Sequence, residues 1–204
     1  MISVTISNVN QQTLIFLGPQ GSGKGTQVAL LKEFLAKQDN RHIVYFTAGT
    51  ALRAFTASEG YTQERVHPLI ASGKLMPTFI TTSLFSARLI GSMTGNDHLI
   101  LDGFPRTLDQ TPDLDTALKF YERKNPTVIY ISLSDEAAKE RLHKRGRTDD
   151  TEEGIEERLR WSHEEAAQVN GWFKKNPDYT FLEINGEQAI EEVHREILEK
   201  LKLV

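Results

Sequence analysis

A glycine-rich segment near the start of the chain has the composition of a phosphate-binding loop. It reads Gly18-Pro-Gln-Gly-Ser-Gly-Lys-Gly-Thr26, follows an apolar run at 13–17 and precedes a helical pattern at 27–38. Glycines let the backbone wrap a phosphate with its N–H groups pointing inward, and the helix N-terminus adds positive potential. We expect Lys24 to bridge the β- and γ-phosphates of a nucleotide and Thr26 to supply a hydroxyl for Mg²⁺. The strict pattern places that hydroxyl directly after the lysine, whereas Gly25 intervenes here.

A second candidate phosphate site follows another apolar run. Residues 99–106 (LILDGFPR) end a predicted strand with Asp102 and then turn through Gly103 and Pro105 to present Arg106. An acid at the carboxyl end of a strand beside a phosphate-binding loop is where Mg²⁺ or its water shell is held. Arg106 would face the same crevice, where a guanidinium forms two hydrogen bonds to one phosphate. Taken alone, Asp102 also fits the role of a turn cap.

Basic residues concentrate in one short interval of the second half of the chain. The segment 144–150 interrupts a helical pattern and fits either a mobile flap or a helix start, with Asp150 or Thr151 as the N-cap. Further along, Arg160 and Glu157 fit a solvated helix face with ion pairs between neighbouring turns. The cations of the interval are Arg141, Lys144, Arg145 and Arg147, and the acids that follow are Asp149, Asp150, Glu152 and Glu153.

Short apolar runs alternate with longer helical patterns along the chain. Because the runs are nearly continuous in hydrophobicity, they indicate strands covered on both faces, as in a parallel sheet. Strands that alternate with helices predict a three-layer α/β domain with right-handed crossovers. About fifty residues separate the second and third strands, which fits an inserted helical lobe; residues 1–12 fit an added edge strand or a ragged arm equally well. The predicted strands are 13–17, 43–46, 99–101, 127–133 and 179–184.

Composition excludes several classes of protein. The 204 residues form one expected domain, and the absence of cysteine excludes disulfides, a cysteine-based zinc site and thiol catalysis. A net charge of −4 argues against a protein that coats nucleic acid or anionic membrane. No apolar run indicates a membrane segment, and no leader pattern indicates secretion. We therefore expect a cytoplasmic protein. The six histidines show no close pair at ligand spacing, and Trp161 and Trp172 are expected to be packing residues. The chain also lacks the Asn-Lys-x-Asp guanine reader of GTPases and is too short for a motor, which leaves a small-molecule kinase.

The two phosphate motifs together resemble those of the nucleoside monophosphate kinases, and adenylate kinases most of all. GPQGSGKGTQ at 18–27 and DGFPRTLDQ at 102–110 carry the resemblance, which continues through SGKLMP at 72–77, the basic segment at 141–159 and ING at 184–186. It covers about residues 13–204. The resemblance implies a P-loop fold with a five-stranded parallel sheet flanked by helices, a lobe for the monophosphate at about 47–76 and a very short lid at about 144–150.

The resemblance also implies a role for particular residues. Lys24, Arg106, Arg147 and Arg158 would be catalytic, with the last two reaching across the transferred phosphoryl group. Thr26 and Asp102 would hold Mg²⁺, through water. The ATP-binding residues would be Gly21, Ser22, Gly23, Lys24, Gly25, Thr26, Arg141, Arg145 and Gln188, with the backbone near Gly186–Gln188 touching adenine. The AMP-binding residues would be Ala48, Arg53, Lys74, Leu75, Met76, Gly103, Phe104, Pro105, Arg106, Gln110, Arg147 and Arg158.

Two positions, Ala48 and Thr50, depart from the adenylate kinase pattern. Ala48 stands where a threonine near the AMP base is usual and is more like the uridylate/cytidylate kinases, whereas Gln110 favours adenine because it offers both a donor and an acceptor. Thr50 replaces a carboxylate that helps to organise water around Mg²⁺. The expected activity is Mg²⁺-dependent, reversible transfer of the ATP γ-phosphoryl group to AMP by a monomer without zinc. The alternatives are a UMP/CMP kinase and a sensor that binds ATP and AMP without turning them over.

Overall fold

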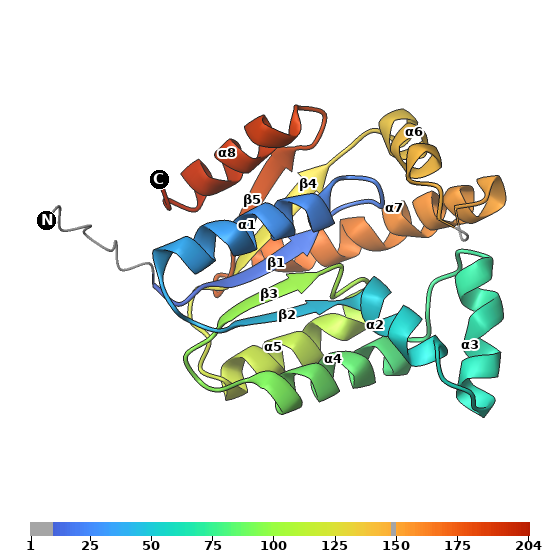
Figure 1. Cartoon of the computed structure of the whole chain (residues 1–204), viewed down its shortest axis with the longest axis horizontal. Coiled ribbons are helices and arrows are strands. Elements are labelled where there is room, and N and C mark those ends of the chain that lie inside the picture. The colour runs from blue at the N-terminus through green and yellow to red at the C-terminus, as the bar shows by residue number, and fades with distance from the viewer. Residues whose placement is uncertain (1–9, 148–149) are drawn as a thin grey trace, which may run out of the picture.

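A five-stranded parallel sheet forms the centre of the molecule (Figure 1). The computed structural model describes residues 10–147 and 150–204. The strands are β1 (Thr13–Leu17), β2 (Ile43–Thr47), β3 (His98–Asp102), β4 (Thr127–Ser132) and β5 (Thr180–Asn185), in the order β2-β3-β1-β4-β5. All four neighbouring pairs are parallel; in β1, Ile15 aligns with Leu101 of β3 and with Val128 of β4. The predicted fold class and the five predicted strands are confirmed.

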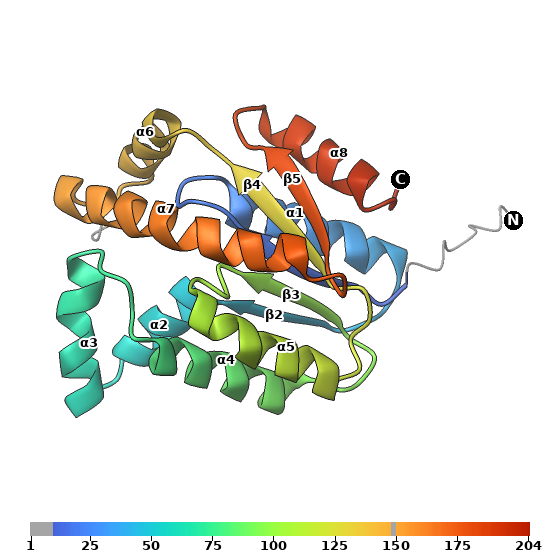
Figure 2. The ribbon, with the colours of Figure 1, turned by 180° about the vertical axis from the view of Figure 1, so that it is seen from behind.

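Helices cover both faces of the sheet. On one face lie α1 (Lys24–Gln38) and α8 (Ile190–Lys200), and on the other α4 (Thr78–Ser92), α5 (Thr111–Phe120) and α7 (Glu152–Lys175) (Figure 2). Alternate residues of β1 enter the two resulting cores, because successive side chains of a strand point to opposite faces. Leu14 and Phe16 pack with α1 and α8, whereas Ile15 and Leu17 belong to the core under α4, α5 and α7. Continuous hydrophobicity in the sequence therefore does reflect a strand buried on both sides.

Two further helices, α2 (Ala48–Thr56) and α3 (Tyr61–Ala71), project beyond the carboxyl end of β2 (Figure 1). They have a small apolar core of their own with the start of α4, formed by Leu52, Val66, Met76 and Ile80. This pair occupies the interval in which the sequence predicts an inserted helical lobe. Its core is separate from the two main cores.

The chain between β4 and β5 forms α6 (Asp135–Arg145) and α7. Gly146 ends α6 in the left-handed region with φ of 61°, and the Gly154 N–H donates to the Thr151 hydroxyl at 3.1 Å, so Thr151 is the N-cap of α7. A short 3₁₀ helix, η1 (Leu108–Gln110), precedes α5. Part of the expected lid, residues 148–149, and most of the 1–12 segment lie outside the described residues. In the part of the chain that is described, no helix is both long and apolar enough to span a bilayer.

Candidate active site

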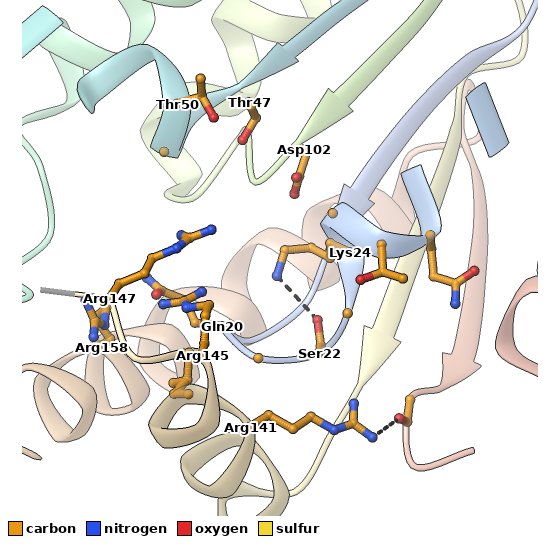
Figure 3. Close-up of a pocket in the computed structure, with 18 of the residues that line it drawn as sticks. Gln20, Ser22, Lys24, Thr47, Thr50, Asp102, Arg141, Arg145, Arg147 and Arg158 are labelled. Atoms are coloured by element: carbon orange, nitrogen blue, oxygen red, sulfur yellow. Dashed lines mark hydrogen bonds between the residues drawn. The ribbon is translucent and has the colours of Figure 1, made fainter. Parts of the chain in front are cut away.

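A cavity of about 870 Å³ opens at the carboxyl ends of the strands. The glycine-rich loop after β1, the ends of β2 and β3, the α2–α3 lobe, α6, the start of α7 and the turn after β5 all contribute to its wall. In an open parallel sheet, ligands bind at this edge. The volume is within the range of small-molecule sites. Figure 3 shows Lys24 in the middle of the cavity, with Asp102, Thr47 and Thr50 on one side and Arg145, Arg147 and Arg158 on another.

The loop between β1 and α1 has the backbone shape that phosphate binding requires. Gly18, Gly21 and Gly23 have φ of 134°, 86° and 92°, a region that favours glycine. A Cβ on Gly18 would lie 2.3 Å from the Ile131 carbonyl oxygen, so a side chain there has no room. The Lys24 ammonium donates to the carbonyl oxygens of Gly18 (2.8 Å) and Pro19 (2.7 Å) and to the Ser22 hydroxyl (3.3 Å). The Lys24 side chain is thus held in place by residues of the same loop.

The pKa of Lys24 is lowered from its ordinary value to about 8. Removal of the ammonium from water is the largest cause, and the positive charges of Arg106 and Arg145 act in the same direction. The carboxylate of Asp102 opposes them and raises the pKa, but does not compensate. A phosphate beside the ammonium would stabilise its charged form.

Asp102 ends β3 and faces the glycine-rich loop. Its Oδ2 lies 4.0 Å from the position that a Cβ on Gly25 would take, and it accepts a hydrogen bond of 3.2 Å from the Tyr45 hydroxyl of β2. Burial, together with the Asp102 charge, raises the pKa of Tyr45 to about 12, so the phenol remains a donor at neutral pH. Mg²⁺ prefers oxygen ligands and keeps several of its waters, so the Asp102 carboxylate and the Thr26 hydroxyl, which both line the cavity, fit a Mg²⁺ site.

Positive charge dominates the cavity. Among the described residues that line it, Asp102 is the only carboxylate, whereas eight side chains are cationic. Such an excess fits a ligand with several negative charges and would repel a cationic one. The cations are Lys24, Arg53, Lys74, Arg106, Arg141, Arg145, Arg147 and Arg158.

An acid at the end of the expected lid, Asp150, holds two of these arginines. The Asp150 carboxylate, 1% exposed, accepts hydrogen bonds from Arg145 (2.9 and 2.6 Å) and from Arg158 (2.9 Å). It also accepts one from the backbone N–H of Arg147. Burial raises the pKa of Asp150, but its hydrogen bonds and the arginine charges outweigh burial and hold the pKa below the usual value. The arginines from α6 and α7 are therefore oriented before any phosphate binds.

Arg106, in the turn after β3, lies close enough to Lys24 and to Arg158 of α7 for their charges to interact. Its Nε donates to the Gly103 carbonyl oxygen at 3.0 Å, and its guanidinium carbon lies 5.6 Å from the ring centroid of Trp161. Removal from water lowers the pKa of Arg106, and the nearby charges of Arg158 and Arg53 lower it further, whereas Asp102 raises it. A group of cations this close together is stabilised by a polyanion.

Most of the residues expected to bind ATP or AMP do line this cavity. Six do not: Ala48, Leu75, Gly103, Phe104, Pro105 and Gln110. Phe104 belongs to the main core, where it stacks on Phe85 at 4.3 Å, and Ala48 is also buried. Gln110, 2% exposed, accepts from the Arg106 backbone N–H at 2.7 Å and donates to the Thr81 hydroxyl at 2.5 Å. Gln110 thus shapes the Arg106 turn, and its buried side chain is not among the residues that line the cavity.

The sequence alone does not place two further residues, Tyr45 and Trp161, in the cavity. Tyr45 lines the cavity beside Asp102, and Trp161, although buried as expected, also lines it. Trp172 instead packs against Phe173 and Tyr179. The position of Trp161 three residues after Arg158 on one helix was a usable signal, because residues at i and i+3 share a helix face. No local signal pairs Tyr45 with Asp102.

Among the described residues no group of three or more His, Asp or Glu side chains could hold a metal ion.

The sequence comparisons agree with the geometry. A sequence model described as adenylate kinase matches residues 16–177.

The chain belongs to the adenylate kinase family. It is 34% identical to the adenylate kinase of Corynebacterium urealyticum over 180 aligned residues. The aligned segment covers 88% of this chain and 93% of that protein. It is 34% identical to adenylate kinase 1 of a Nostoc species over 184 residues, 90% of this chain and 95% of the relative. The adenylate kinase of Prochlorococcus marinus is 33% identical over 191 residues, 94% of this chain and 97% of that protein. Membership in the adenylate kinase family makes this chain a nucleoside monophosphate kinase, an enzyme that transfers phosphoryl groups between nucleotides.

Proposed function

We propose that this enzyme transfers the γ-phosphoryl group of ATP reversibly to AMP, giving two ADP, with Mg²⁺. The observation that carries the proposal is the arrangement of the cavity. Of the described side chains that line it, eight are cationic and one is a carboxylate, with the glycine-rich loop at one end and the α2–α3 lobe at the other. Two phosphorylated substrates that meet in one site require such an excess of positive charge. One small anion does not.

The chain's own residues provide positioning and charge neutralisation. The AMP phosphate is already an anionic nucleophile, so the transfer needs no general base. Lys24 and the loop N–H groups would bind the β- and γ-phosphates of ATP, and Arg53 with Arg106 the phosphate of AMP. Arg147 and Arg158, at the lid and the start of α7, would neutralise the charge that spreads over the transferred group in the transition state.

Thr26 and Asp102 would hold Mg²⁺ through water. When bound, the ion neutralises phosphate oxygens and orients them. Asp102 is held in place by the Tyr45 hydroxyl, at 3.2 Å. Thr50, where a carboxylate is usual in the family, accepts a hydrogen bond of 3.2 Å from Arg53, so its hydroxyl serves the monophosphate side.

A pyrimidine monophosphate is the second candidate acceptor. The observation that favours it is the engagement of Gln110 with Arg106 and Thr81, together with the small buried Ala48. The Gln110 amide remains the chain's best partner for adenine, because one reoriented amide offers a donor and an acceptor to the base edge. AMP is therefore the acceptor that we propose.

A coupled assay of ADP production tests the proposal. ATP and Mg²⁺ are supplied with AMP, UMP, CMP, GMP or dTMP in turn, and each reaction is repeated with excess chelator. We expect the highest kcat/KM with AMP and loss of turnover with chelator. Higher efficiency with UMP or CMP would replace AMP as the acceptor. Binding of ATP and AMP without turnover of any monophosphate would instead support a sensor.

A further inference from the structure

Trp161 lies where the α2–α3 lobe meets α7. Its side chain is 8% exposed and lines the cavity, yet it belongs neither to the core of the lobe nor to the small α6–α7 core of Ala138, Leu142, Ile155 and Leu159. Besides packing, its indole makes contacts through its N–H group and its ring face. Two such contacts are specific.

The first contact ties α7 to the lobe. The indole Nε1 of Trp161 donates to the Gly73 carbonyl oxygen at 2.9 Å. Gly73 follows α3 with φ of 69°; its N–H donates to the Ile70 carbonyl oxygen, and the Lys74 N–H donates to that of Leu69. This is the pattern of a Schellman cap, which uses both N–H groups. The cap does not use the Gly73 carbonyl oxygen, which accepts the hydrogen bond from the indole.

The close approach of two backbones fixes this junction. A Cβ on Gly73 would lie 2.4 Å from the carbonyl oxygen and 3.0 Å from the Cα of Gly154, in the first turn of α7. Lys74 and Met76, directly after Gly73, line the cavity on the monophosphate side. We call residues 73–76 the strap. Its position depends on α7 through the contacts of Gly73 with Gly154 and with Trp161.

The second contact is with Arg106. The guanidinium carbon lies 5.6 Å from the centroid of the Trp161 ring, within the range of a cation–π interaction. A carboxylate partner would occupy the N–H donors of the arginine. An aromatic face orients the guanidinium plane and leaves those donors directed to a phosphate, apart from the Nε that binds Gly103.

We propose that Trp161 is a positioning residue for the acceptor side of the site, which holds Arg106 by its ring face and the Gly73–Met76 strap by its N–H. The inference rests on the proposed function, because it assigns Arg106 and the strap to the monophosphate. It predicts that Trp161 controls binding of the acceptor and leaves the ATP side, built on the loop after β1 and the turn after β5, unaffected.

Two substitutions separate the two contacts. Trp161→Phe keeps an aromatic face and removes the N–H donor, whereas Trp161→Leu removes both. We expect KM for AMP to rise about threefold in Trp161→Phe and about tenfold or more in Trp161→Leu, from the usual strength of a buried hydrogen bond and a cation–π contact. KM for ATP should stay within about twofold of wild type. Trp172→Phe, on the same helix but packed against Phe173 and Tyr179, is the matched control and should change neither constant.

Intrinsic fluorescence reports on the surroundings of Trp161 independently of turnover. In the Trp172→Phe protein, Trp161 is the only tryptophan, since the chain contains two. Its emission should change on titration with AMP and saturate at the AMP dissociation constant, with little change on addition of a non-hydrolysable ATP analogue. Equal rises of both KM values, unchanged KM for AMP in Trp161→Leu, or emission that ignores AMP would overturn the inference. Wild-type turnover with each monophosphate tests the proposed function separately. If another monophosphate is the better acceptor, the KM measurements and the emission titration are made with that monophosphate, so the role of Trp161 is decided in either case.

Discussion

The lowered pKa of Lys24 leads to a pH dependence of nucleotide binding. In the free protein the ammonium titrates at about 8, because it is withdrawn from water and faces Arg106 and Arg145. The phosphates of a bound nucleotide favour the charged lysine and raise its pKa. Below pH 7 the lysine is charged in both states and the affinity is constant. Above pH 8 binding must be accompanied by uptake of a proton, so the affinity falls as pH rises.

The size of the effect follows from the pKa. With a free pKa near 8, the charged fraction of Lys24 falls from about nine-tenths at pH 7 to about one-tenth at pH 9. If the complex keeps the lysine charged over this range, the affinity for a triphosphate falls about tenfold, equivalent to about 1.4 kcal/mol. At pH 8 binding should take up about half a proton. Tyr45, whose pKa is raised to about 12, does not titrate in this window.

Calorimetric titration with a non-hydrolysable ATP analogue provides the measurement. Titrations at pH 7, 8 and 9, each in two buffers of different ionisation enthalpy, yield both the affinity and the number of protons taken up. Lys24→Met is the control: it should bind more weakly at pH 7 and lose the pH dependence. Constant wild-type affinity between pH 7 and 9, or an equal slope in Lys24→Met, would refute the reasoning.

Four further predictions concern turnover, acceptor choice, lid charge and stability. Lys24→Met should lower kcat at least about a hundredfold with an unchanged melting temperature, because its charge counts most in the transition state; near-normal turnover in a steady-state assay would contradict the role of the loop. Gln110→Asn should reduce kcat/KM with AMP by about 1–3 kcal/mol and affect CMP or UMP less, and the same assay with each monophosphate would show otherwise if pyrimidine turnover fell instead. Arg147→Ala should lose most of the turnover, by roughly 10³-fold or more, and also part of the salt dependence with which the protein binds two adenosines joined by five phosphates; equal salt slopes in variant and wild type would argue against contact with phosphate. Both Gly73→Ala and Gly146→Ala place an alanine at positive φ, which costs about 1–2 kcal/mol of folding free energy. Gly73→Ala should lower the free energy of unfolding further, because only its Cβ would meet backbone atoms of α7. Equal denaturation midpoints for the two variants would show that the contact between Gly73 and α7 adjusts without cost.

The sequence by itself determined those parts of the site that local patterns encode. The glycine-rich loop is recognisable because its positive φ angles demand glycine at particular spacings, and they occur at Gly18, Gly21 and Gly23. The apolar runs predicted all five strands, because a strand buried on both faces must be apolar throughout. Once the sheet is parallel, the residue that ends a strand faces the ligand edge, and Asp102 was predicted there on that ground. Thr151 was one of two N-cap candidates, and its hydroxyl takes that role.

Tertiary structure alone decided which distant side chains share a partner. Tyr45 contacts Asp102 because β2 and β3 are neighbours in the sheet, an order that no local pattern specifies. Gln110 is turned onto Arg106 and Thr81 because η1 packs beside α4. Trp161 reaches Arg106 and Gly73 because α7 crosses between the turn after β3 and the end of α3. Periodicity reports which side of a helix is buried, but the neighbour on that side depends on how the helices and strands pack, and packing is a property of the whole chain.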